Sequence, residues 1–398
     1  MSPRTLELLD LIARWVHVIA GIMWIGNSLL FNWLDRILEP SSRRGEGMQG
    51  ETWLVHSGGF YFFEKTLLVG QQLPRPLHWL KWQAYTTWIS GAVQLVVVYY
   101  VGGRALLVGG ARPDLSPSAA VATAVGAIIA AWVVYDLLWR FVAPRSKTIA
   151  AVLSLAGLAA LTWLLTYALS GRAAFLHVGA ALGTIMAGNV AMTIMPSQRA
   201  LVAGVSEGRG SDTAIAEQAK MRSIHNNYLT FPVIVLMLSS HFPSLYGHRL
   251  SWPILLALIA AGAGVRHVMN VRFTYRRWVL ALAATVVVSV AMLYVLMNAG
   301  PRRGGLAAPQ VRAGGATFEE ARSVLDRRCT ACHSAQPSDL SFGPVPGGVA
   351  FDTPEQIRAL ADRIRARAVE THTMPPANKT RITDAERALL GAWTAGPR

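Results

Sequence analysis

Residues 8–35 have the sequence LLDLIARWVHVIAGIMWIGNSLLFNWLD, an apolar stretch that is long enough to cross a bilayer. A transmembrane helix needs about 20 consecutive residues that are mostly apolar. Seven further stretches of this kind predict an all-α fold with an eight-helix transmembrane bundle. The first stretch lacks a small-residue cleavage site, which favours a retained helix over a signal peptide. The expected spans are 8–34, 86–103, 118–140, 148–170, 174–195, 229–246, 252–271 and 277–299.

The basic residues indicate how these spans are oriented. The chain has 37 Lys and Arg against 22 Asp and Glu, and 26 of the basic residues precede residue 316. They concentrate in the connections after the first, third, fifth and seventh spans, which the positive-inside rule assigns to the cytoplasm. Both termini are then expected on the periplasmic side of a bacterial inner membrane. This pattern accounts for the basic charge without a nucleic-acid partner.

The only two cysteines of the chain stand in the motif C-x-x-C-H at Cys329, Cys332 and His333. This motif attaches a c-type haem through two thioether bonds and supplies a histidine ligand to the iron. Zinc would need further soft ligands, and a thioredoxin-like pair would need a βαβ context that the sequence does not show. Met374, in THTMPPANKT (371–380), is the expected second axial ligand. The sequence therefore predicts one covalent haem c.

The surrounding residues predict a small class I cytochrome c domain over 316–398. Thr317 with Glu320, and Thr383 with Glu386, have the spacing of helix capping boxes on either side of the haem motif. Residues 300–315 are rich in Gly, Ala and Pro and indicate a flexible linker. The expected domains are therefore a membrane domain (1–299), this linker, and a periplasmic cytochrome c domain (316–398).

One cytoplasmic connection, residues 35–85, is unusually long and rich in aromatic residues. It has no clear periodic pattern, and so many aromatic residues argue against disorder. Two interpretations stay open: an interfacial belt that lies on lipid headgroups, and a lid over an active site.

Several histidines lie within or beside the apolar spans, where ionisable side chains usually face a cavity, a cofactor or one another. The expected topology sorts them into two layers across the membrane. Two such layers are compatible with three roles for the histidines. They could be the ligands of bis-histidine haem b that relays electrons, they could transfer protons, or they could bind another metal. The outer layer contains His17, His177 and His241, and the inner layer contains His56, His78, His225 and His267.

Several stretches, taken together with the C-terminal haem motif, resemble the bacterial membrane-integrated urate oxidase (urate hydroxylase) family. They are RWVHVIAGIMWIGNSLLFNWLD (14–35), LVHSGGFYFFEK (54–65), LHWLKWQAYTTWISG (77–91), LHVGAALGTIMAGNVAMTIMPSQR (176–199), HNNYLTFPVIVLMLSSHFP (225–243) and RHVMN (266–270). The resemblance implies oxidation of urate to 5-hydroxyisourate in purine catabolism. It also implies electron transfer through haem c to a soluble cytochrome c or a terminal oxidase.

The chemistry of urate selects candidate residues from these stretches. Urate is an anion near neutral pH, so cationic and amide side chains are expected to hydrogen-bond to its edges. A histidine is suited to act as the proton acceptor. The substrate-binding candidates are Arg14, Lys65, Asn226, Asn227 and Arg266. The candidate bases are His17, His56, His177 and His225.

Two other functions stay open at this stage. The bundle could anchor a cytochrome c electron-transfer subunit of another dehydrogenase or oxidase, although a single span would suffice for that. It could also be a transporter, but the sequence shows no internal repeat. The chain has no P-loop, dinucleotide fingerprint or hydrolase motif, which argues against ATP, NAD and hydrolysis.

Overall fold

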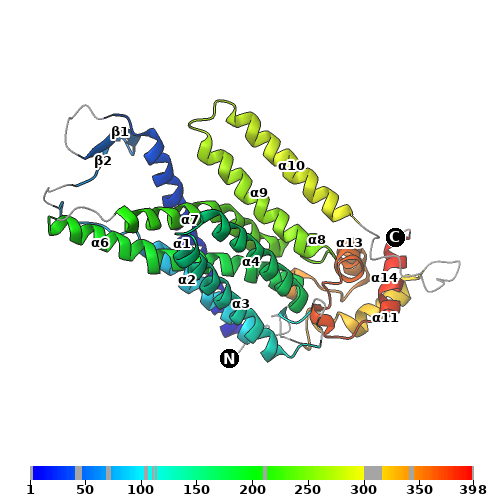
Figure 1. Cartoon of the computed structure of the whole chain (residues 1–398). Coiled ribbons are helices and arrows are strands. Elements are labelled where there is room, and N and C mark those ends of the chain that lie inside the picture. The colour runs from blue at the N-terminus through cyan, green and yellow to red at the C-terminus, as the bar shows by residue number, and fades with distance from the viewer. Residues whose placement is uncertain are drawn as a thin grey trace.

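The computed structural model describes residues 3–40, 47–68, 73–102, 106–109, 112, 114–208, 213–299, 316–339 and 345–396. These residues form a bundle of long helices, a β-hairpin and a group of short helices near the C-terminus (Figure 1). The 73% helix content confirms a mostly helical fold, and the β-hairpin is an element that the all-α prediction did not include. The expected linker, 300–315, lies outside the described residues.

Within the described residues, seven helices are long and apolar enough to cross a membrane. They coincide with seven of the eight expected spans and indicate a multi-pass membrane protein. Some extend well beyond the bilayer: the first has 35 residues, or about 52 Å at 1.5 Å per residue. Three of the seven include π-helical continuations: α2 (Trp82–Leu95) spans on to Val101, α3 (Pro117–Leu137) to Val142, and α5 (Gly171–Asn189) to Ser206. The other four are α1 (Pro3–Ile37), α4 (Lys147–Ala168), α9 (Ser251–Val271) and α10 (Trp278–Asn298).

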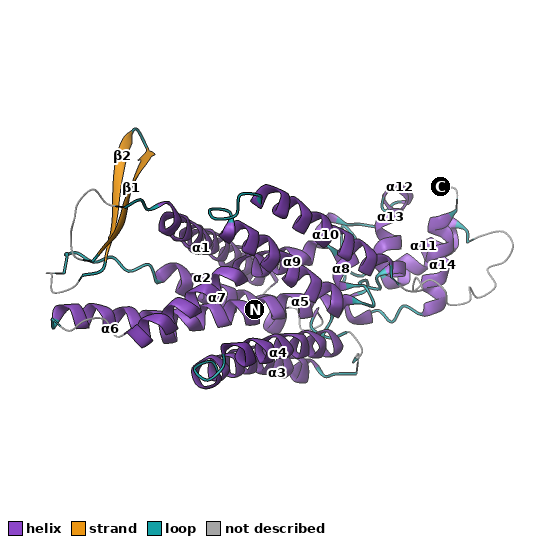
Figure 2. Ribbon diagram, turned by 45° about the horizontal axis from the view of Figure 1, so that its top comes forward, coloured by secondary structure: helices purple, strands orange, loops and turns teal. Residues whose placement is uncertain are grey.

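At the sixth expected span, 229–246, the structure differs from the prediction. Helix α7 (Thr213–Leu238) starts well before it with a polar half and ends at Leu238. A 3₁₀ turn (Ser239–His241) and the short helix α8 (Pro243–Tyr246) follow. The apolar half of α7 is therefore too short to qualify as a span by composition, although the helix packs between α5 and α9 (Figure 2).

Serine caps set the start of three consecutive helices of the bundle. The side chains of Ser116, Ser146 and Ser170 accept hydrogen bonds from backbone N–H groups in the first turns of α3, α4 and α5. Each cap satisfies an N–H group that would otherwise lack a partner at the end of an apolar helix. The caps fix where these helices begin.

Helix α5 is the centre of the bundle. It packs against α3, α4 and α7, and small residues such as Ala173, Ala174 and Ala181 let these neighbours approach closely. The chain continues beyond α5 through a π-helical segment (Val190–Ile194) into α6 (Met195–Ser206). In contrast, α10 packs against α9 but has no buried residue.

The connection 35–85 contains a β-hairpin that the sequence analysis did not predict. Strand β1 (Met48–His56) pairs antiparallel with β2 (Gly59–Thr66). Ser57 and Gly58 both have positive φ, as a two-residue hairpin turn requires. Aromatic residues such as Trp53, opposite Phe62, favour strands, which explains the hairpin locally. Several of these aromatic side chains are exposed.

The C-terminal helices lie at the opposite end of the bundle from the hairpin and α6 (Figure 2). This group has its own apolar core, in which Leu325, Ile357 and Leu390 are fully buried. Its helices are α11 (Phe318–Arg328), α12 (Pro354–Ala359), α13 (Ala361–Ile364) and α14 (Asp384–Ala395), with a π-helical segment at Arg365–Glu370.

The contact between α3 and α5 generates a stability prediction. A Cβ added at Gly188 would lie 2.1 Å from Nε1 of Trp132, whereas a Cβ at Gly183 on the same helix would meet nothing within 4 Å. Gly188→Ala should therefore destabilise the protein by about 1–3 kcal/mol through overpacking. Thermal unfolding in detergent would measure this loss, and Gly183→Ala is the matched control. Equal stability of the two variants would contradict this packing.

Candidate functional site

A group of buried polar side chains lies toward the end of the bundle that carries the hairpin, called the inner end here. Asp136 is 19 residues from the start of α3, or about 28 Å along the helix. Arg266 is 15 residues, or about 22 Å, from the start of α9. The hydrogen bonds form two sets, which adjoin at the consecutive residues Asn226 and Asn227 of α7 and are together called the polar network. One set contains Tyr135, Asp136, Asn189, Arg222, His225 and Asn226, and the other contains Asn227, Arg266 and Asn270.

A buried ion pair joins α3 to α7 within the polar network. Nη2 of Arg222 donates to Oδ1 of Asp136 at 2.8 Å, and the Arg222 side chain is 1% exposed. Its guanidinium also lies 4.9 Å from the centre of the Tyr135 ring. Asp136 is further paired with Arg140, which is 47% exposed. Two charges in an apolar bundle are tolerable only because each compensates the other.

Asn189 connects this ion pair to the neighbouring residues. It accepts a hydrogen bond from Arg222 at 3.2 Å and donates to Asn226 at 2.9 Å and to the Tyr135 hydroxyl at 3.1 Å. The same hydroxyl lies 2.7 Å from Nδ1 of His225. The amide therefore brings α3, α5 and α7 together around one hydrogen-bonded centre.

The second half of the polar network contains an arginine with incomplete hydrogen bonding. Oδ1 of Asn227 accepts from Nε of Arg266 at 3.1 Å and from Nδ2 of Asn270 at 2.7 Å. Within the described residues, Nη2 of Arg266 is buried and has no hydrogen-bond partner. A buried donor of this kind normally has a partner, so this atom indicates a place where a ligand could bind.

Arg266 also lines a pocket of about 360 Å³ between α1 and α9. Trp33 offers an aromatic face and Asn32 an amide, and two cationic side chains reach the same space. Such a mixture of apolar walls and a few polar groups is typical of a small-molecule site. The lining residues are Leu29, Leu30, Asn32, Trp33, Arg266, Met269 and Arg272.

Residues 3–297 match the family described as urate oxidase N-terminal. The chain belongs to this family. The match covers the bundle, including the polar network and the pocket, and membership implies an oxidoreductase role. No curated protein and no solved structure matches the chain.

Four of the predicted site residues of this family member lie together. His225, Asn226 and Asn227 are consecutive on α7, and Asn227 holds Arg266 on α9. Only Arg266 among them lines the pocket. The polar network therefore groups one candidate base with three candidate substrate ligands.

The other predicted ligands lie away from this group. Arg14 pairs with Asp10 on the surface of α1, and Lys65 of the hairpin pairs with Asp35. His56 is an exposed residue at the end of β1. The structure does not bring these three side chains into the polar network.

The remaining histidines make separate contacts. His17 bonds through Nδ1 to the carbonyl of Thr87 at 2.8 Å. Both ring nitrogens of His177 are engaged, by the Ala173 carbonyl and the Tyr100 hydroxyl. His267 contacts the Tyr228 hydroxyl, and His241 lies in the 3₁₀ turn after α7. Within the described residues no group of three His, Cys, Asp or Glu could hold a metal ion, and haem b stays a prediction.

The C-terminal helices begin as the capping-box spacing predicted. Thr317 and Glu320 cap α11, and Thr383 and Glu386 cap α14, each pair through reciprocal hydrogen bonds. These contacts confirm the two helix starts. They place Cys329 directly after α11, because the helix ends at Arg328.

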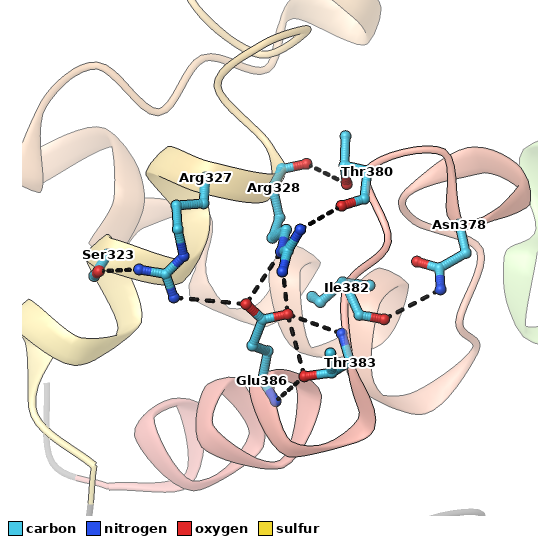
Figure 3. A network of polar contacts seen from close by, with 8 residues as sticks. All are labelled: Ser323, Arg327, Arg328, Asn378, Thr380, Ile382, Thr383 and Glu386. Carbon is cyan, nitrogen blue, oxygen red and sulfur yellow. Dashed lines mark hydrogen bonds and ion pairs between the residues drawn. The ribbon is translucent and has the colours of Figure 1, made fainter.

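Glu386 is the centre of a polar cluster that joins three parts of this region (Figure 3). Arg328 donates to Glu386 at 3.1 Å and to the carbonyl of Thr380 at 2.7 Å, while Thr380 donates back to Arg328. Burial raises the pKa of Glu386, but hydrogen bonds from Thr383 and Arg328 outweigh this effect and lower it. The cluster ties the residue before Cys329 to the segment that follows Met374.

The C-x-x-C-H residues have the chemistry that a haem c site requires. Cys329 and Cys332 are free thiols, and burial raises the pKa of Cys329 to about 12. Nδ1 of His333 lies 3.0 Å from the carbonyl of Val349, which orients the ring and leaves Nε2 as the potential ligand atom. Burial lowers the pKa of His333, which favours the neutral form that binds iron. These residues fit the group.

Asp136, Arg222 and Tyr135 are members of the site that were not predicted from the sequence. An acidic residue inside the third apolar span was a usable signal, because such a residue rarely lies there without a partner. Arg222 was interpreted only as a basic residue of a cytoplasmic connection. Its burial depends on α7 starting before the expected span, which local composition did not reveal.

The Asp136–Arg222 ion pair generates a second stability prediction. Asp136→Asn should cost about 3–5 kcal/mol of unfolding free energy, because it leaves the Arg222 charge buried without compensation. Arg140→Gln, which removes the exposed partner of the same carboxylate, should cost about 1 kcal/mol or less. Chemical denaturation in detergent would measure both. Similar losses of unfolding free energy in the two variants would show that the buried Asp136–Arg222 pair matters no more than the exposed Asp136–Arg140 pair.

Proposed function

We propose that the chain is a membrane-bound urate oxidase that forms 5-hydroxyisourate and passes the electrons to a haem c in its C-terminal domain. Family membership over residues 3–297 supports urate as the substrate. The observation that carries the substrate site is the unpartnered Nη2 atom of buried Arg266 at the wall of a pocket. A planar anion supplies the acceptor that this atom lacks.

The pocket offers complementary contacts to the two faces and edges of urate. Arg266 can donate a charge-assisted hydrogen bond to a urate oxygen, while Asn227 holds the guanidinium in place through Nε. Trp33 provides a face for the purine ring. Arg272 adds positive charge at the same pocket, so the anion is attracted even before it reaches Arg266.

The oxidation requires a proton acceptor and an electron acceptor. Written for neutral uric acid, addition of one water and formation of 5-hydroxyisourate release two protons and two electrons. His225 is the proposed proton acceptor, because it is the candidate base on α7, two residues before Asn227, which accepts a hydrogen bond from Arg266. Tyr135 orients its ring through Nδ1.

The proposed haem c is held by four residues of the C-terminal domain. Cys329 and Cys332 would attach the porphyrin, and His333 and Met374 would be the axial ligands. A haem c would accept one electron at a time, so the oxidation of each urate would require two successive electron transfers. His333 is oriented for this role by Val349, and the carbonyl of Met374 accepts a hydrogen bond from Arg387 at 2.9 Å.

The proposed location is the bacterial inner membrane, with the N-terminus and cytochrome domain in the periplasm. The basic connections and the external attachment of c-type haem support this orientation. A soluble cytochrome c or a terminal oxidase would then receive the electrons. The inner end of the bundle, with its pocket, would face the cytoplasm.

Anaerobic titration of the purified full-length protein with urate is the experiment that tests the function. Absorbance in the haem α-band region should report reduction, and a pyridine haemochrome assay should give one c-type haem per chain. Two haems should be reduced for each urate consumed. Reduction by dithionite but not by urate would overturn the proposal and favour an electron-transfer subunit with another donor.

Replacement of Arg266 tests the substrate pocket. Loss of one charge-assisted hydrogen bond is worth about 1.5–3 kcal/mol, so Arg266→Gln should raise the KM for urate about 10- to 100-fold. Steady-state kinetics would measure this change, with the haem spectrum and thermal stability as checks on folding. Arg276→Gln, at an exposed arginine outside this pocket, is the matched control. An unchanged KM in Arg266→Gln would place urate elsewhere.

A further inference from the structure

The C-terminal domain touches the outer end of the bundle at a glycine. A Cβ added at Gly247, directly after α8, would lie 2.6 Å from Cβ and 3.1 Å from the carbonyl oxygen of Thr371. Beside this contact, the Tyr246 hydroxyl is 3.5 Å from Nη1 of Arg367. Gly247 has φ of −84°, which any residue adopts. Gly247 therefore allows the bundle and the C-terminal domain to approach each other closely. Its backbone conformation does not require a glycine.

The segment that makes these contacts is the one that presents Met374. Thr371 donates to the carbonyl of Ala366 at 2.7 Å, and the N–H of Met374 donates to the carbonyl of Arg367 at 3.0 Å. Arg387 donates to the carbonyls of both Ala368 and Met374. We call residues 365–374 the Met374 segment. These bonds make it a stable surface, so a contact at Thr371 also positions Met374.

On the bundle side, the contact is continuous with a buried aromatic group. Tyr246 is 6% exposed and packs edge-to-face on Phe175, with ring centres 6.4 Å apart. Phe175 precedes His177 by two residues on α5, and the His177 ring contacts those of Tyr99 and Tyr100. The Met374 segment therefore rests on Tyr246, whose ring packs against α5 through Phe175.

We propose that Tyr246 and Gly247 form a docking surface for the chain's own Met374 segment, which holds the cytochrome domain against the outer end of the bundle. A tether alone would leave this domain at many distances from the bundle. Docking keeps the Met374 side of the domain against Tyr246, which packs on Phe175 of α5. Electrons from urate then reach the haem c iron through a fixed contact, one at a time, and this last step rests on the proposed function.

Disulfide formation tests the docking without any dependence on urate. The double variant Gly247→Cys with Thr371→Cys in the full-length haem-loaded protein should oxidise to an intramolecular disulfide, identified as a linked peptide by mass spectrometry. The two Cβ atoms need to separate by only about 1 Å to reach disulfide geometry. Gly157→Cys with Thr371→Cys is the control, since Gly157 has open space around it. Equal linkage in both pairs, or none at Gly247, would overturn the docking.

Kinetics of haem reduction test what the docking does. Gly247→Val and Gly247→Leu enlarge the interface from the bundle side, away from the Met374 segment itself, and each should slow reduction by urate at least about tenfold. Both should leave the visible spectrum, the midpoint potential and the rate of reduction by dithionite unchanged. Gly157→Val should behave as wild type. Unchanged urate-driven rates in both interface variants would overturn the electron-transfer role, while failure of urate to reduce the wild-type haem would overturn the proposed function and leave the disulfide result valid.

Discussion

The buried ion pair between Arg222 and Asp136 is the constraint on which the inner end of the bundle depends. In an apolar bundle an uncompensated charge is expensive, so α3 and α7 have to meet at this point. Once they do, Asn189 can bond to both Arg222 and Asn226, and the next residue of α7, Asn227, faces α9. Asn227 in turn accepts a hydrogen bond from Nε of Arg266, which lines the pocket.

In the proposed mechanism, urate binding and electron delivery to the cytochrome domain take place at different depths of the membrane domain. The pocket lies about 22 Å along α9 from its start, whereas the Met374 segment meets the bundle just before α9 begins. Substrate binding needs a cationic group that water does not shield, which the inner end provides. The proposed haem c would be attached outside the membrane. The close contact between Gly247 and Thr371 lies at the outer of these two places.

Prediction from sequence was accurate where a local pattern is sufficient. Seven apolar spans and two capping boxes were recognised, because helix length and cap spacing are local properties. It was inaccurate where the structure depends on contacts between distant residues. Arg14 and Lys65 were chosen as ligands for their charge, but each has a carboxylate partner nearby and takes no part in the polar network.

The sequence by itself determined a multi-pass helical membrane protein, the oxidoreductase family of its bundle and the residues available to hold a haem. Only the tertiary structure decided which polar residues work together. His225, Asn226 and Arg266 were candidates among many, and nothing local distinguished them from Arg14 or His56. Their selection required Asp136 on α3 to compensate Arg222 on α7, because the energy of a buried charge depends on what surrounds it in space and not on its neighbours along the chain.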